Sequence, residues 1–123
     1  MKKIILALCF SILVGCVSSP PTDEISKADF GNLPSNHQDL VKEKLGTTLK
    51  DPYSAHYNFG LVGKAWCKSG FTTYYGWLIP VTVNAKNSYG GYVGNTPMAF
   101  LYTKGQVIDF TASYQVGGCG IVH

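Results

Sequence analysis

The chain has 123 residues, 14% of them charged, with ten lysines and no arginine. This length suits one small domain, which can bury a core but gains from a covalent staple. Because arginine is the preferred residue for bidentate contacts with phosphates and bases, its absence argues against a nucleic-acid-binding protein.

The first sixteen residues read MKKIILALCFSILVGC and have the pattern of a secretory signal peptide. Two lysines precede an apolar run over residues 4–14, which is too short to span a bilayer because a span needs roughly 20 residues. The final Leu-Val-Gly-Cys resembles the bacterial lipobox, which implies cleavage after residue 15 and lipidation of Cys16. We therefore predict a signal peptide over 1–15 and an envelope protein with palmitate or a similar lipid as its membrane anchor. Val17 in place of aspartate resembles the sorting pattern for the outer membrane rather than the inner membrane.

The next segment, residues 16–34, is predicted to be a flexible tether that begins with the lipidated cysteine. It is rich in proline and small polar residues, and such a composition cannot bury enough surface to order itself. Phe30 and Leu33 are its candidates for docking on the domain that follows.

Residues 35–49 are predicted to form a helix at the start of a globular domain that covers 35–123. Ser35 and Gln38 have the spacing of a capping box. Four apolar residues recur at helical spacing and give the helix one buried face (Leu40, Val41, Leu45 and Leu49).

The rest of the chain is predicted to be β-structure with hairpin-length connections. Alternating apolar residues and glycine-containing turns indicate five strands (53–59, 64–68, 72–85, 98–103 and 106–114). Pro80 cannot donate to a ladder, so it marks an edge position or a bulge in the third of them. The expected fold class is α+β, with one N-terminal helix packed on a small antiparallel sheet.

Four cysteines have three expected fates. Cys9 leaves with the signal peptide, and Cys16 carries lipid through its sulfur. Cys67 and Cys119 then form an even pair in a chain exported to an oxidising compartment, which predicts a disulfide. The alternative is two buried free thiols.

The glycine-rich loop between the third and fourth strands, residues 84–94, is the best candidate binding site. Function gathers on loops held by a rigid sheet, and tyrosine and asparagine are favoured contact residues there. Its candidate contact residues are Lys86, Asn87, Tyr89, Gly90, Gly91 and Tyr92. The alternative is a structural loop whose tyrosines cover the edge of the sheet.

No catalytic, cofactor or metal motif is present in the sequence. His37, His56 and His123 lack the spacing of metal ligands, and there is no G-x-S-x-G turn. We therefore expect no cofactor, no metal and no enzymatic activity.

Two segments carry a resemblance to a known group of proteins. Residues 49–57 read LKDPYSAHY and residues 84–92 read NAKNSYGGY. They resemble the LKDPxSAxY and VNAKNSxGGY segments of small exported proteins and lipoproteins of Gram-negative bacteria and their prophages, a family with no established activity. The resemblance implies an exported protein and adds no catalytic or binding residue.

These observations predict a membrane-anchored lipoprotein whose small domain binds a protein or another component of the envelope. A second hypothesis is a phage- or plasmid-derived envelope protein that excludes competitors by masking a surface receptor. A third is a cell-wall hydrolase or an inhibitor of one, which would require a pair of carboxylates in a cleft.

Overall fold

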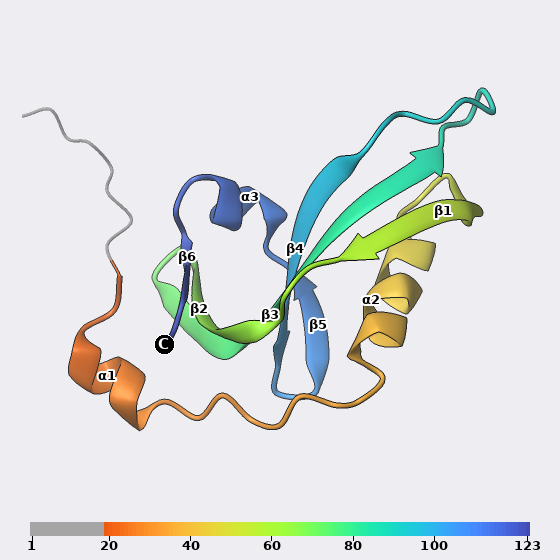
Figure 1. The fold of residues 1–123 in the computed structure, drawn as a ribbon. Helices are drawn as coiled ribbons and strands as arrows, with labels where there is room; N and C mark the ends of the chain where they lie inside the picture. Colours follow the sequence, from red (N-terminus) through yellow and green to blue (C-terminus); the bar gives the residue numbers. More distant parts are fainter. Residues whose placement is uncertain (1–18) are drawn as a thin grey trace, which may run out of the picture.

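The structure is a computed structural model that describes residues 19–123 (Figure 1). The predicted signal peptide and Cys16 lie outside these residues. In chain order the elements are α1 (Thr22–Lys27), α2 (His37–Gly46), β1 (Asp51–Phe59), β2 (Gly63–Ser69), β3 (Thr72–Lys86), β4 (Thr96–Thr103), β5 (Gln106–Asp109), α3 (Thr111–Gln115) and β6 (Cys119–Ile121). All strands belong to one six-stranded antiparallel sheet, so the α+β class is confirmed. Within residues 19–123, no helix is long and apolar enough to cross a membrane.

The sheet is built on β3, a strand of 15 residues that pairs along nearly its whole length. On one side it pairs with β4. On the other side it pairs first with β2, over residues 72–78, and then with β1, which faces residues 81–86. β2 and β1 thus share one edge of β3. The strand order is β5-β4-β3-β2-β6, and β1 pairs with β3 outside this order.

Pro80 lies in the middle of β3, where its partner changes from β2 to β1. Its carbonyl oxygen accepts a hydrogen bond of 2.9 Å from the amide of Gly60, in the link between β1 and β2. The amide and carbonyl of one residue point to the same side of a strand, so the missing N–H of Pro80 faces this changeover. A central strand tolerates proline here because this side is locally an edge.

One face of the sheet carries α2. Val41 and Leu45 on α2 pack with four buried residues of β3 and β4 (Ile79, Val81, Val83 and Phe100). The helix is shorter than predicted, because it begins at His37 and ends at Gly46. The capping box at Ser35 does not form: Asn36 occupies the N-cap position, with no side-chain hydrogen bond to the helix.

The second apolar cluster lies around the disulfide. Cys67 on β2 and Cys119 on β6 are register partners and are bonded to each other, which confirms the predicted pair. Cys67 is fully buried with Leu78, Leu101 and other residues. Next to the bridge, a side chain at Gly120 would overlap the indole ring of Trp66. The chain can therefore close over that ring only with glycine at this position.

The predicted last hairpin strand is wrong beyond residue 109. Residues 111–115 form α3 instead of a continuation of β5. The carboxylate of Asp109 accepts hydrogen bonds from the amide of Thr111, at 2.9 Å, and from its hydroxyl, at 2.6 Å. This local turn competes with the strand ladder and redirects the chain into the helix.

The segment predicted to be a tether carries structure in its described part. Residues 22–27 form α1, and the segment after it contacts the sheet. The ring of Phe30 meets that of Tyr75 edge to face at 5.8 Å, and the indole N–H of Trp77 donates to the carbonyl of Gly31 at 3.0 Å. Burial, with a smaller contribution from Glu24, raises the pKa of Tyr75 above its usual value. Contacts of the domain therefore begin before residue 35.

Candidate functional site

The two segments that carry the family resemblance lie side by side in the structure. β1 pairs with the end of β3, with His56 opposite Asn84 and Asp51 opposite Lys86. The register shifts between these pairs, and Ser54 lies in the irregularity. Its hydroxyl accepts a hydrogen bond of 2.9 Å from the amide of Lys86 and donates one of 2.7 Å to the carbonyl of Asp51. The bulge is thus closed by a side chain instead of by the ladder.

Tyr92 fastens the loop to β1. Its ring stacks on His56 with centroids 5.4 Å apart, and its hydroxyl donates to the carbonyl of Ser54 at 3.1 Å. The same hydroxyl oxygen lies 3.0 Å from Nε2 of His56, and Nζ of Lys86 lies 5.5 Å from the ring centroid. Tyr92 is 46% exposed, because its ring packs against His56.

Asn87 organises the tip of the loop. Its side-chain oxygen accepts hydrogen bonds from the amides of Tyr89, at 2.9 Å, and Gly91, at 3.2 Å. Gly90 has a φ of +82°, in the region that favours glycine, whereas Gly91 does not have a positive φ. The two glycines therefore differ: Gly90 is required by the turn and Gly91 is not.

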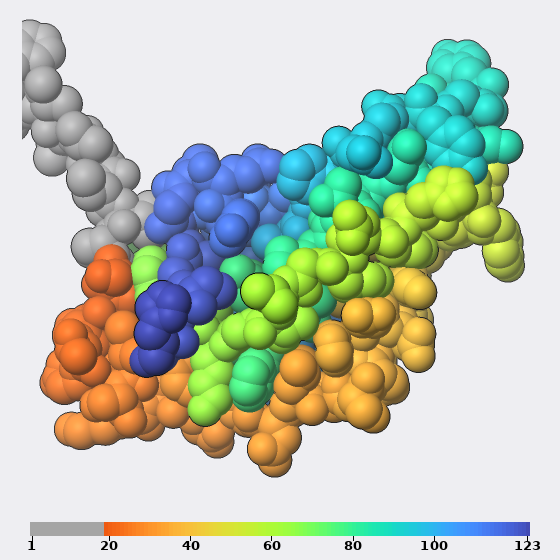
Figure 2. Space-filling view, in the orientation of Figure 1, coloured from red at the N-terminus to blue at the C-terminus, as the bar shows by residue number. Residues whose placement is uncertain are grey.

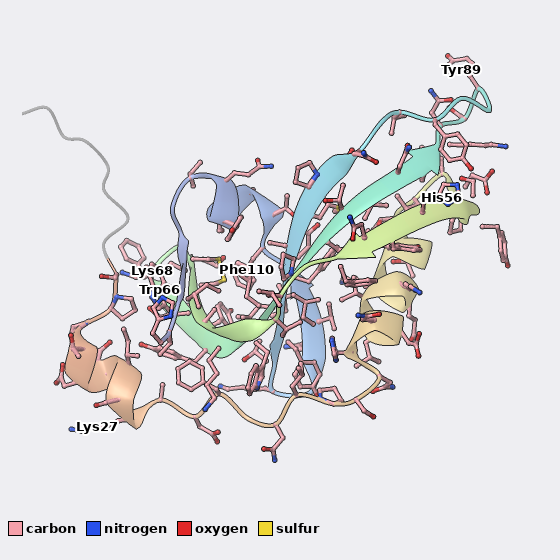
Figure 3. All side chains as sticks on the ribbon, in the orientation of Figure 1. Lys27, His56, Trp66, Lys68, Tyr89 and Phe110 are labelled. Atoms are coloured by element: carbon pink, nitrogen blue, oxygen red, sulfur yellow. A yellow bond between two sulfur atoms is a disulfide. The ribbon has the colours of Figure 1, made fainter. Side chains whose placement is uncertain are left out.

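Tyr89 projects from this turn with 95% of its surface exposed, at the extreme end of the molecule (Figure 3). Tyr53, at the start of β1 and next in sequence to Ser54, is also fully exposed. We name the four exposed or half-exposed residues at this end of the sheet the distal tip (Tyr53, Tyr89, Tyr92 and Val93). Tyr53 carries no signal of its own in the sequence, because it occupies the first of the two variable positions in the LKDPxSAxY segment.

The predicted loop residues have different structural roles. Tyr89 is free to contact a partner, Tyr92 and Asn87 build the loop, and Lys86 lies against Tyr92. His37 is held elsewhere, with Nδ1 at 2.9 Å from the carbonyl of Pro34. Across residues 19–123, no three histidine, cysteine or acidic side chains are grouped as a metal site would require. The distal tip consists of exposed or half-exposed tyrosine and valine side chains.

Comparison of the chain with family models, with curated proteins and with solved structures finds no match.

Proposed function

We propose that the protein is a lipid-anchored envelope protein whose domain binds a protein partner through the distal tip. The observation that carries this proposal is the pair of fully exposed tyrosine rings, Tyr53 and Tyr89, at one end of the sheet. A tyrosine ring covers a large area at a small cost in conformational entropy, and its hydroxyl adds a hydrogen bond. Such rings are typical of protein-binding surfaces and have no packing role in this fold.

The direction of the chain supports the same arrangement. Lys27 in α1 and Tyr89 in the loop lie at opposite ends of the molecule (Figure 3). A lipid on Cys16, eleven residues before Lys27, would hold the α1 end at the membrane. The distal tip would then project away from that surface, where it could meet a partner.

The anchor is tested by metabolic labelling with a clickable fatty acid. We expect the wild-type protein to take up the label and Cys16→Ser to remain unlabelled, because the lipobox cysteine is the proposed acceptor. Label on the variant would contradict the anchor. Membrane fractionation of the wild type tests the outer-membrane assignment, which recovery with the inner membrane would overturn.

The tip is tested by photo-crosslinking in intact cells, with a photoreactive amino acid at position 89. The matched control places it at Lys104, an exposed residue in the turn between β4 and β5. We expect a discrete crosslinked product from position 89 and none from 104. Equal products from both positions, or none from 89, would refute the proposal. If the crosslinked partner is a surface receptor, the protein would be an exclusion protein that masks this receptor.

A further inference from the structure

A concave surface lies on the face of the sheet that does not carry α2. It has a volume of about 550 Å³, within the range of roughly 300–1,000 Å³ typical of small-molecule sites. β1, β3, β4 and α3 form its walls, and Figure 2 shows β3 and β4 between the blue of α3 and the yellow-green of β1. We call this surface the α3 groove.

The floor of the α3 groove is a row of side chains across three strands. Asn58 on β1 is opposite Thr82 on β3, which is opposite Pro97 on β4. Because side chains alternate along a strand, these residues point away from the face where Val81 and Val83 pack under α2. Pro80 lies in the next row of the floor. The floor thus combines two polar side chains with two proline rings.

α3 forms the opposite wall and is fixed to β4. The hydroxyl of Thr111 accepts a hydrogen bond of 3.1 Å from the amide of Ala99, which holds the start of the helix. Tyr114, one turn later, is 48% exposed and lines the groove together with Gln115. About half of this side chain is therefore accessible at the wall of the groove.

The lining is uncharged and its hydrogen-bonding groups are available. Among residues 19–123, no lysine, aspartate, glutamate or histidine lines the groove. The side chains of Asn58, Thr82 and Tyr114 make no hydrogen bond with any residue from 19 to 123. Amides and hydroxyls can each donate and accept. The groove therefore suits a neutral ligand that is rich in groups of both kinds.

We propose that the α3 groove binds a neutral glycan. Each sugar hydroxyl both donates and accepts, which the amide and hydroxyl groups of the lining match. The carbon–hydrogen face of a sugar ring is apolar and can pack on the ring of Tyr114 or on Pro80 and Pro97. This binding does not depend on the distal tip, which lies at the end of the sheet.

An extended peptide is the competing occupant, and the sheet geometry disfavours it. Peptides that add to a sheet use the free backbone groups of an edge strand. The α3 groove lies over the face of β3, which at residues 81–83 is paired with β1 on one side and with β4 on the other. Its floor therefore offers side chains in place of main-chain partners.

The proposal is tested by calorimetric titration of the full chain with three neutral trisaccharides: chitotriose, cellotriose and maltotriose. We expect at least one to bind. Tyr114→Ala and Asn58→Ala should each weaken that binding by about tenfold or more, the loss of roughly 1.4 kcal/mol. Tyr114→Phe keeps the ring and should lose less than Tyr114→Ala.

The matched control is Phe71→Ala, which removes an exposed ring outside both the groove and the distal tip and should leave sugar binding unchanged. Circular dichroism of each variant verifies that the fold is retained. The proposal is overturned if none of the three sugars binds, if Tyr114→Ala binds as well as the wild type, or if only a neutral peptide binds at these residues. None of these outcomes bears on the crosslinking test of the distal tip.

Discussion

The two halves of β3 are held in different ways. The proximal half, residues 72–78, pairs with β2, and β2 is itself covered by β6 through the Cys67–Cys119 bridge. The distal half, residues 81–86, pairs with β1, whose other edge has no strand beside it in the described chain, and then opens into the loop. One half is closed covalently, and the other ends in exposed side chains.

This difference indicates a division of labour along a single strand. The proximal half buries Cys67, Leu78 and their neighbours, so substitutions there act on the free energy of unfolding. The distal half buries Val81 and Val83 under α2, but its outer end is closed only by hydrogen bonds of Ser54, Asn87 and Tyr92, each of which contributes modestly. Four sets of substitutions test this comparison.

The largest effect is expected from removal of the disulfide. In Cys67→Ala/Cys119→Ala, the unfolded chain regains the freedom of a loop whose ends are separated by 52 positions. The free energy of unfolding, measured by urea denaturation, should fall by about 2–5 kcal/mol. A loss below about 1 kcal/mol would mean that the proximal half does not depend on its covalent closure.

The second effect separates the two adjacent glycines of the loop. Gly90→Val forces a branched side chain into a positive φ and should cost about 1–3 kcal/mol. Gly91→Val is the matched control, because no atom lies within 4 Å of its added Cβ, and it should change stability by less than about 0.5 kcal/mol. Equal losses from the two variants, in thermal or urea unfolding, would contradict this assignment.

The third effect isolates the hydroxyl of Tyr92. Tyr92→Phe keeps the stack on His56 but removes the hydrogen bond to the carbonyl of Ser54, so stability should fall by about 0.5–1.5 kcal/mol. Tyr89→Phe, in which the lost hydroxyl is exposed, is the control and should be neutral. If the two variants have the same melting temperature, the loop is not fastened through Tyr92.

The smallest effect on stability is expected at the distal tip. Tyr89→Ala and Tyr53→Ala should shift the free energy of unfolding by less than about 0.5 kcal/mol, because both rings are exposed. Both should nevertheless weaken partner capture, since truncated interface tyrosines commonly cost about 2 kcal/mol or more once buried. A variant that unfolds would instead assign its ring to the core.

Local pattern was enough to predict much of this fold. The alternation in residues 53–59 places Tyr57 and Phe59 toward the core and leaves His56 exposed, as the structure has it. The disulfide followed from the number of cysteines and the predicted export. α3 was missed because Phe110 continues an apolar alternation, while the side chain of Asp109 decides the turn.

The candidate sites were less predictable, because they are assembled from distant parts of the chain. Tyr53 becomes part of the distal tip only through the register of β1 on β3. The α3 groove takes residues from four elements, and none of them carries a motif. The composition of the loop predicts the same contact role for Tyr89 and Tyr92. Only the contacts of Tyr92 with His56 and Ser54 show that its role differs from that of Tyr89.

The position of Pro80 has a consequence for how the molecule opens. On one side of β3 the ladder is interrupted at this residue, while β4 runs past it unbroken on the other. Proteins open locally in cooperative units that follow such boundaries. We therefore expect β1 and the loop to fray as one unit in hydrogen exchange, with their amides exchanging earlier than those of β2. A force applied at the distal tip would then separate β1 from β3 as far as Pro80 before it acts on the half of the sheet that holds the disulfide.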